Sequence, residues 1–188
     1  MVYVNKMFDY PFQEYEEAID EEYWAGKIGS TYEDYEDGKW VLLTEKQAAF
    51  HNANPEASVR EVLEGDSLAY AKEKKIAEIE AYDSSENVNC FYINGNPMWL
   101  TVDERQQIAT QISANDAVGR ESMTKWFEGV EYTFPLATWK QMLVAVEVYA
   151  GDALNVTEAH KAAVSALTTI KAVNAFDVTA DYPEKLQF

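Results

Sequence analysis

The sequence predicts an α+β fold: a small compact domain of about four helices and two β-hairpins, preceded by a partly extended, acidic and aromatic N-terminal arm. Three observations lead to this prediction. Apolar residues recur at helical spacing in several segments, short apolar runs flank glycine turns, and the first 40 residues are poor in aliphatic side chains. We therefore divide the chain into the arm at 1–40, a strand and helix lead-in at 41–71, and an α+β domain at 72–188.

The arm combines acidic and aromatic side chains. It holds eleven acids against three lysines, and half of the twelve tyrosines of the chain. Such a segment cannot easily build its own core, but tyrosine and tryptophan suit a surface that orders against a partner. The alternative is that the arm packs back on its own domain. The residues that we predict to contact a partner are Phe8, Tyr10, Phe12, Tyr15, Tyr23, Trp24, Tyr32 and Tyr35.

Local signals then place the elements before residue 72. Residues 14–24 are compatible with a short helix, and residues 40–43 read as a strand after a glycine turn. A capping box from Thr44 to Gln47 opens a helix that should stop before Pro55. Residues 58–62 are predicted to form a strand.

The most regular helical pattern of the chain spans residues 68–82, where apolar residues and lysine stems share one face. Two hairpins are predicted after it. One turns at Asn94 and Gly95, which tolerate positive φ angles, and the other turns at Glu128 and Gly129.

Three more helices complete the predicted domain. A capping box at Thr101 opens a helix that reaches about residue 117, and Pro135 opens another that reaches about residue 150. Thr157 is predicted to cap a separate final helix. Residues 173–188 should form a partly extended tail.

Charge and composition restrict the partners. A formal net charge of -18 disfavours binding along a nucleic-acid backbone or to an anionic membrane, so other proteins are the expected partners. The first residues lack the regions of a signal peptide, and no stretch approaches the roughly 20 apolar residues of a membrane span. We expect a soluble product made in a cytoplasm.

No catalytic signature occurs in the sequence, so we predict no enzyme, no cofactor and no metal site. The P-loop, dinucleotide-binding and metalloprotease motifs are missing. The single cysteine, Cys90, excludes an internal disulfide and is expected to be a buried thiol, and structural roles are expected for His51 and His160. The acidic residues 33–38 fail the calcium-loop pattern, because its twelfth position would be Thr44 instead of a bidentate acid.

Several short sequences carry a resemblance to a known family: residues 75–85, 88–91, 98–100, 119–121, 126–127, 149–150, 155–164 and 182–186, with Arg105. The string Asn155-Val156-Thr157-Glu158-Ala159-His160 is the most specific of them. Through these pieces, residues 72–188 resemble a domain of uncharacterised function at the C-terminal end of proteins from phages and prophages of gut bacteria, commonly near tail genes. Residues 43–62 resemble its usual lead-in.

The resemblance implies a virion or virion-assembly protein of the tail region, with no assigned catalytic residues. Our leading hypothesis is a structural adaptor in the particle, whose arm docks on another tail, fibre or collar protein. An oligomer within the particle is compatible with this role. A tail-fibre assembly chaperone is the first alternative. A receptor- or glycan-binding tip is the second, with Trp99, Trp126 and Trp139 as candidates for a carbohydrate platform, although tryptophans at such positions are more often core residues.

Overall fold

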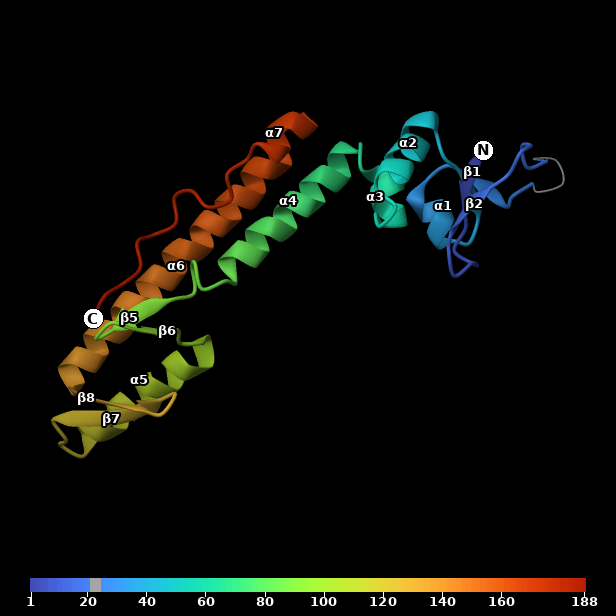
Figure 1. The fold of residues 1–188 in the computed structure, drawn as a ribbon. Helices are drawn as coiled ribbons and strands as arrows, with labels where there is room; N and C mark the ends of the chain where they lie inside the picture. The colour runs from blue at the N-terminus through green and yellow to red at the C-terminus, as the bar shows by residue number, and fades with distance from the viewer. Residues whose placement is uncertain (21–24) are drawn as a thin grey trace. The chain divides into compact units, whose positions relative to one another are not determined.

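The computed structural model of the protein describes residues 1–20 and 25–188 (Figure 1). The chain forms two compact units: unit 1 comprises residues 1–74 and 168–174, and unit 2 comprises residues 75–167 and 175–188. Helices and small antiparallel or mixed sheets occur in both, which confirms the predicted α+β class. In the described part of the chain, no helix has both the length and the apolar character needed to cross a bilayer.

Unit 1 is built on a sheet with the strand order β2-β1-β4-β3. The strand β1 (Val2–Val4) pairs antiparallel with β2 (Phe12–Glu14) and with β4 (Trp40–Leu42), and β3 (Ile28–Gly29) pairs parallel with β4. The strand predicted at 40–43 is therefore confirmed.

The helix suggested over 14–24 is wrong for its described part. Glu14 closes β2, where its Cα lies opposite that of Val2, and residues 15–20 are not helical. Pairing with β1 satisfies the backbone of residues 12–14, and this non-local interaction outweighs a weak helical pattern. Residues 21–24, which include the predicted contacts Tyr23 and Trp24, lie outside the described residues.

Three short helices within residues 1–74 of unit 1 each begin with a capping box. These helices are α1 (Tyr32–Glu36), α2 (Glu45–Ala53) and α3 (Val59–Glu64). The helix α2 confirms the expectation from the sequence. The strand predicted at 58–62 is wrong, because the Ser58 hydroxyl accepts the Glu61 N–H while the Glu61 carboxylate accepts the Ser58 N–H.

The core of unit 1 shows how the N-terminal 40 residues fold. Val4 and Phe12 come from these residues, whereas Val41, Leu43 and Val62 come from the lead-in. In the structure, residues 1–40 are thus part of a folded unit and not a separate arm. The residues that follow them supply most of the aliphatic side chains of this core.

The boundary between the units falls inside α4 (Leu68–Asp83), between Lys74 and Lys75, and the bounds of α4 confirm the helix predicted at 68–82. The short helix α7 (Ile170–Asn174) belongs to unit 1.

Unit 2 is organised around one long helix, α6 (Leu136–Ala166). The predicted break between residues 150 and 157 is wrong, since the helix runs through Gly151, and Thr157 is buried instead of capping a new helix. The reason is that buried residues continue at helical spacing along the whole of α6. They are Leu136, Trp139, Met142, Val146, Tyr149, Ala153, Thr157, His160 and Val164.

Both predicted hairpins of unit 2 are confirmed. The strands β5 (Phe91–Ile93) and β6 (Asn96–Met98) are joined by Asn94 and Gly95, both with positive φ. The strands β7 (Ser122–Phe127) and β8 (Val130–Pro135) are joined by a similar turn at residues 128 and 129.

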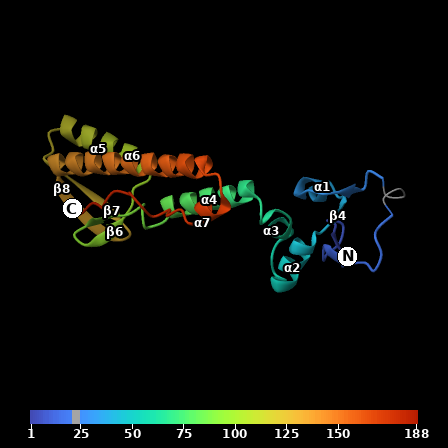
Figure 2. The same cartoon turned by 90° about the horizontal axis from the view of Figure 1, so that it is seen from above.

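The helix α5 (Val102–Ala117) opens with the predicted capping box at Thr101 and lies against one end of α6 (Figure 2). The C-terminal tail ends beside β5, where Tyr92 and Gln187 form a parallel bridge. A single apolar cluster joins these parts, and within it the Trp139 indole N–H donates to the Met123 carbonyl over 2.9 Å.

The continuity of α6 can be tested at Gly151. An added Cβ would meet nothing within 4 Å at this helical position. The substitution Gly151→Ala should therefore raise the free energy of unfolding of unit 2 by about 0.5–1 kcal/mol, because alanine loses less backbone entropy in a helix. Urea unfolding followed by circular dichroism measures the change.

The matched control is Gly95→Ala at the hairpin turn, where φ is 79° and a side chain is strained. That substitution should destabilise the protein. A loss of stability in Gly151→Ala would contradict a continuous α6.

Candidate partner-binding site

The two faces of the unit 1 sheet differ in chemistry. Side chains alternate between the faces of a strand, so Val4 and Val41, which are paired across β1 and β4, both point into the core. On that face, Ala48 of α2 and Leu63 of α3 pack against them. The other face carries Tyr3, the neighbour of Val4, and therefore presents a separate aromatic surface.

Four aromatic rings gather on this second face around Trp40, and we name them the Trp40 cluster: Tyr3, Phe8, Tyr15 and Trp40. Ring centroids lie 5.5 Å from Phe8 to Trp40 and 5.7 Å from Tyr15 to Trp40, and Tyr3 lies 5.9 Å from Tyr15. Most of these contacts are edge to face, as the quadrupoles of aromatic rings favour.

The Trp40 cluster is anchored on one side and open on the other. Tyr3 is buried, and its hydroxyl accepts the Ile19 N–H over 3.1 Å. Phe8 is 44% exposed and Tyr15 is 40% exposed, with Met7 beside Phe8 at 82%. A contiguous exposed surface of large apolar side chains is typical of a protein-contact site.

Ion pairs hold the turns next to this face. Lys6 pairs with Glu36 at 2.5 Å, and Lys39 pairs with Asp34 at 2.6 Å. Lys39, together with hydrogen bonds from Ser30 and Thr31, holds the pKa of Asp34 well below its usual range. These carboxylates therefore stay charged and paired with their lysines over the whole physiological range.

Tyr10 and Phe12 belong to a second aromatic group, around His51. The Tyr10 hydroxyl lies 3.0 Å from His51 Nε2, and the Phe12 ring stacks on the imidazole at 3.8 Å between centroids. Tyr10 is 57% exposed, whereas Phe12 is a buried core residue. Of these two predicted contact residues, only Tyr10 is available on the surface.

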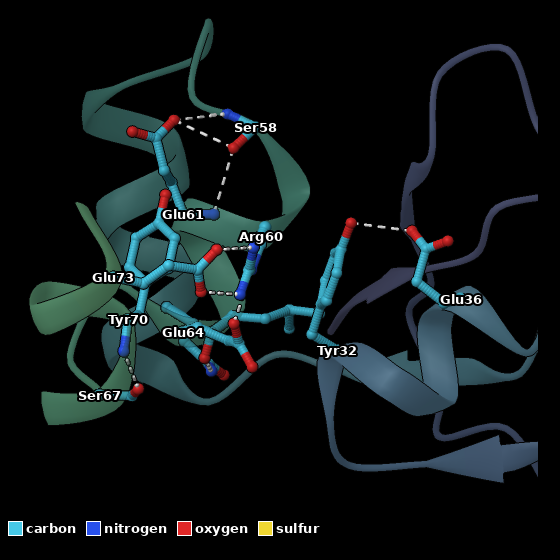
Figure 3. Close-up of polar contacts among 11 residues, drawn as sticks. Tyr32, Glu36, Ser58, Arg60, Glu61, Glu64, Ser67, Tyr70 and Glu73 are labelled. Atoms are coloured by element: carbon cyan, nitrogen blue, oxygen red, sulfur yellow. Dashed lines mark hydrogen bonds and ion pairs between the residues drawn. The ribbon is translucent and has the colours of Figure 1, made fainter. Parts of the chain in front are cut away.

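Tyr32 and Tyr35 form a third group on α1, where their rings stack at 5.7 Å. Tyr35 packs against the core of unit 1. The guanidinium of Arg60 lies between the rings of Tyr32 and Tyr70 (Figure 3). Its central carbon is 5.5 Å from the centroid of the Tyr32 ring and 5.2 Å from that of the Tyr70 ring.

Arg60 is also paired with two carboxylates. It donates to Glu64 over 2.9 Å and, through both terminal nitrogens, to Glu73 over 2.5 and 2.8 Å (Figure 3). Next to it, Lys74 donates to Glu61 over 3.0 Å. The Arg60 site therefore joins α1, α3 and the first half of α4 within unit 1, and its cation and anions are already satisfied.

The predicted contact residues are thus divided among three groups. The structure brings Phe8 and Tyr15 together and places Tyr10, Tyr32 and Tyr35 elsewhere. Trp40, the centre of the first group, is not among the predicted contact residues. A signal was available: in the strand Trp40-Val41-Leu42, alternation sets Trp40 and the 44% exposed Leu42 opposite the core residue Val41.

The described residues offer little for metal or redox chemistry. Among residues 1–20 and 25–188, no three His, Cys, Asp or Glu side chains lie close enough together to hold a metal ion. Cys90 is buried, and His160 packs between the rings of Phe176 and Tyr182. The Trp40 cluster offers aromatic contact area bordered by carboxylates, which is chemistry for binding.

The family described as Domain of unknown function (DUF4376) matches residues 70–180, which is more than half of the chain. The chain belongs to this family. Neither the curated proteins nor the solved structures contain a match to the sequence. The Trp40 cluster lies outside the matched residues.

The link between α3 and α4 in unit 1 should depend on pH. Lys74, and then the hydrogen bonds from Ser58, lower the pKa of Glu61 from its usual value of 4.5. The charged carboxylate therefore stabilises the fold above pH 4.5, and this effect is lost as the pH falls through the lower folded-state pKa. Thermal unfolding of Glu61→Gln should occur at a lower temperature than that of the unsubstituted protein at pH 7, and the difference should vanish well below pH 4.5.

Glu56→Gln, at an exposed position just before α3, is the matched control and should change little at any pH. A deficit in Glu61→Gln that persists unchanged into strong acid would show that the charge is not the cause.

Proposed function

We propose that this protein is a non-enzymatic structural adaptor of a bacteriophage particle, from the tail region, that contacts neighbouring virion proteins through the Trp40 cluster of unit 1. The observation that carries the proposal is the second face of the sheet. There Phe8 and Tyr15 expose aromatic rings against Trp40, and Met7, which precedes Phe8 in the chain, is 82% exposed. Aromatic and methionine side chains are enriched at the centres of protein interfaces.

The phage context is supported by the sequence resemblance of residues 72–188 alone. The DUF4376 family is described as a domain of unknown function and adds no context. The partners would be tail, fibre or collar components, and the protein would be located in the virion after synthesis in the host. The surface charge supports a protein partner with a basic face more than nucleic acid or an anionic membrane.

The environment of the two histidines supports a non-enzymatic role. His51 is stacked on Phe12, and His160 is packed between Phe176 and Tyr182. Both side chains are buried, and a general base must instead reach a substrate proton. We therefore assign both histidines to packing.

Two other functions compete with the adaptor. A tail-fibre assembly chaperone would use the same surface transiently. A glycan-binding tip is favoured by one observation, Trp126, which is 63% exposed in β7. Trp139 is buried in the core of unit 2, so it cannot contribute to a carbohydrate platform.

Substitution on the Trp40 face tests the adaptor. Deletion of residues 1–40 would remove β1, β2 and β3 together, so point changes are needed. The double substitution Met7→Ser and Phe8→Ser should lower the copy number in purified particles about tenfold, the effect of losing one interface hot spot. Quantitative mass spectrometry of particles measures the copy number, and circular dichroism confirms that the variant is folded.

Val118→Ser with Trp126→Ser is the matched control, because both residues are exposed and apolar but belong to unit 2. Incorporation of this control should be normal. Absence of the unsubstituted chain from purified particles contradicts the adaptor. A substoichiometric amount of the chain in particles identifies the chaperone. If the unit 2 control alone loses incorporation, the contact surface is on unit 2.

A further inference from the structure

A groove lies beside the Trp40 cluster, and its lining is unusual in combining aromatic rings with free carboxylates. It is lined by Tyr15, Glu16, Glu17, Ala18, Ile19 and Trp40. The rings of Tyr15 and Trp40 meet at 76° with centroids 5.7 Å apart. The groove is therefore walled by one indole and one phenol.

Glu16 and Glu17 are both exposed, and neither forms an ion pair or hydrogen bond with a described residue. Several other acids of unit 1 differ in this respect: Asp34, Glu36 and Glu73 are each paired with a lysine or arginine of the same unit. The two carboxylates of the groove thus have the capacity to bind a cation from outside the chain.

A cation would be attracted by the aromatic rings of the groove as well as by its two carboxylates. The faces of tryptophan and tyrosine attract an ammonium or a guanidinium through the ring quadrupole. Arginine fits better than lysine, because its planar guanidinium stacks on a ring, is weakly hydrated and can bind a carboxylate through two parallel hydrogen bonds.

The same chain contains a filled example of this chemistry. At the Arg60 site, one guanidinium lies between the rings of Tyr32 and Tyr70 and is paired with Glu64 and Glu73 (Figure 3). The groove repeats the combination of two rings and two carboxylates, and no described residue supplies its cation.

We propose that this groove binds an arginine side chain in a basic segment of the partner protein. The proposal rests on the proposed adaptor function and names the chemistry of its partner. Charge complementarity supports this occupant, because residues 1–40 hold eleven acids and three lysines and would attract a basic segment over some distance. The exposed rings of the Trp40 cluster would then contact the apolar residues around that arginine.

The test uses the intact protein and three small probes, N-acetyl-arginine amide, N-acetyl-lysine amide and the neutral isostere N-acetyl-citrulline amide. Two-dimensional NMR follows the Trp40 indole N–H and the backbone amides of residues 15–19. Arginine amide should shift these signals saturably, with the millimolar affinity expected of so small a ligand. Lysine amide should bind more weakly, and citrulline amide should not saturate.

Matched variants separate the groove from the overall charge. The double substitution Glu16→Gln with Glu17→Gln should lower the affinity for N-acetyl-arginine amide about fivefold. Glu45→Gln with Glu56→Gln changes the net charge equally at exposed positions and should leave the affinity unchanged. Equal weakening in the two double variants, or equal binding of citrulline amide, would overturn the proposal. A chain that is absent from particles but binds arginine amide would overturn the adaptor alone, so the two failures are distinguishable.

Discussion

The position of β1 between β2 and β4 is the constraint on which unit 1 depends. Its residue Val4 is fully buried and pairs with Phe12 on one side and Val41 on the other. This pairing gives the N-terminal residues the aliphatic neighbours that they lack. Because strand residues alternate, filling one face with Val4 and Val41 leaves the intervening aromatic positions on the opposite face. The position of Tyr3 and Trp40 on that face is thus a direct consequence of how the sheet acquires its core, and the exposed rings of Phe8 and Tyr15 pack against Trp40 there.

Local chemistry predicts much of this fold, and non-local packing decides the rest. The capping boxes at Thr44 and Thr101 and the turn at Gly95 involve residues close in sequence, so they could be read without the structure. At residues 58–62, the capping box formed by Ser58 and Glu61 outweighs the strand tendency of the two valines. In α6, the signals of Gly151 and Thr157 indicated a break, but burial of one continuous face outweighed them.

The candidate site was predictable as a composition but not as a geometry. An acidic, tyrosine-rich segment indicates a contact surface, yet composition cannot tell that Phe12 enters the core or that Trp40 organises the exposed rings. Those assignments depend on which strands pair, and β4 is separated from β1 by more than 30 residues of sequence. Register across such a separation is not specified by any local signal.

The residues that carry the sequence resemblance have a structural explanation in unit 2. Thr157, within its most specific string, places its hydroxyl 2.8 Å from an Asp83 carboxylate oxygen and 2.8 Å from the Tyr182 hydroxyl. His160 lies one turn further along α6 and packs against the same tyrosine. The buried Thr157 hydroxyl needs such partners, so Asp83, Thr157 and Tyr182 restrict one another even though they are far apart in sequence. The family match covers most of unit 2, including Asp83, Thr157 and His160, whereas the Trp40 surface lies in residues that the match does not include.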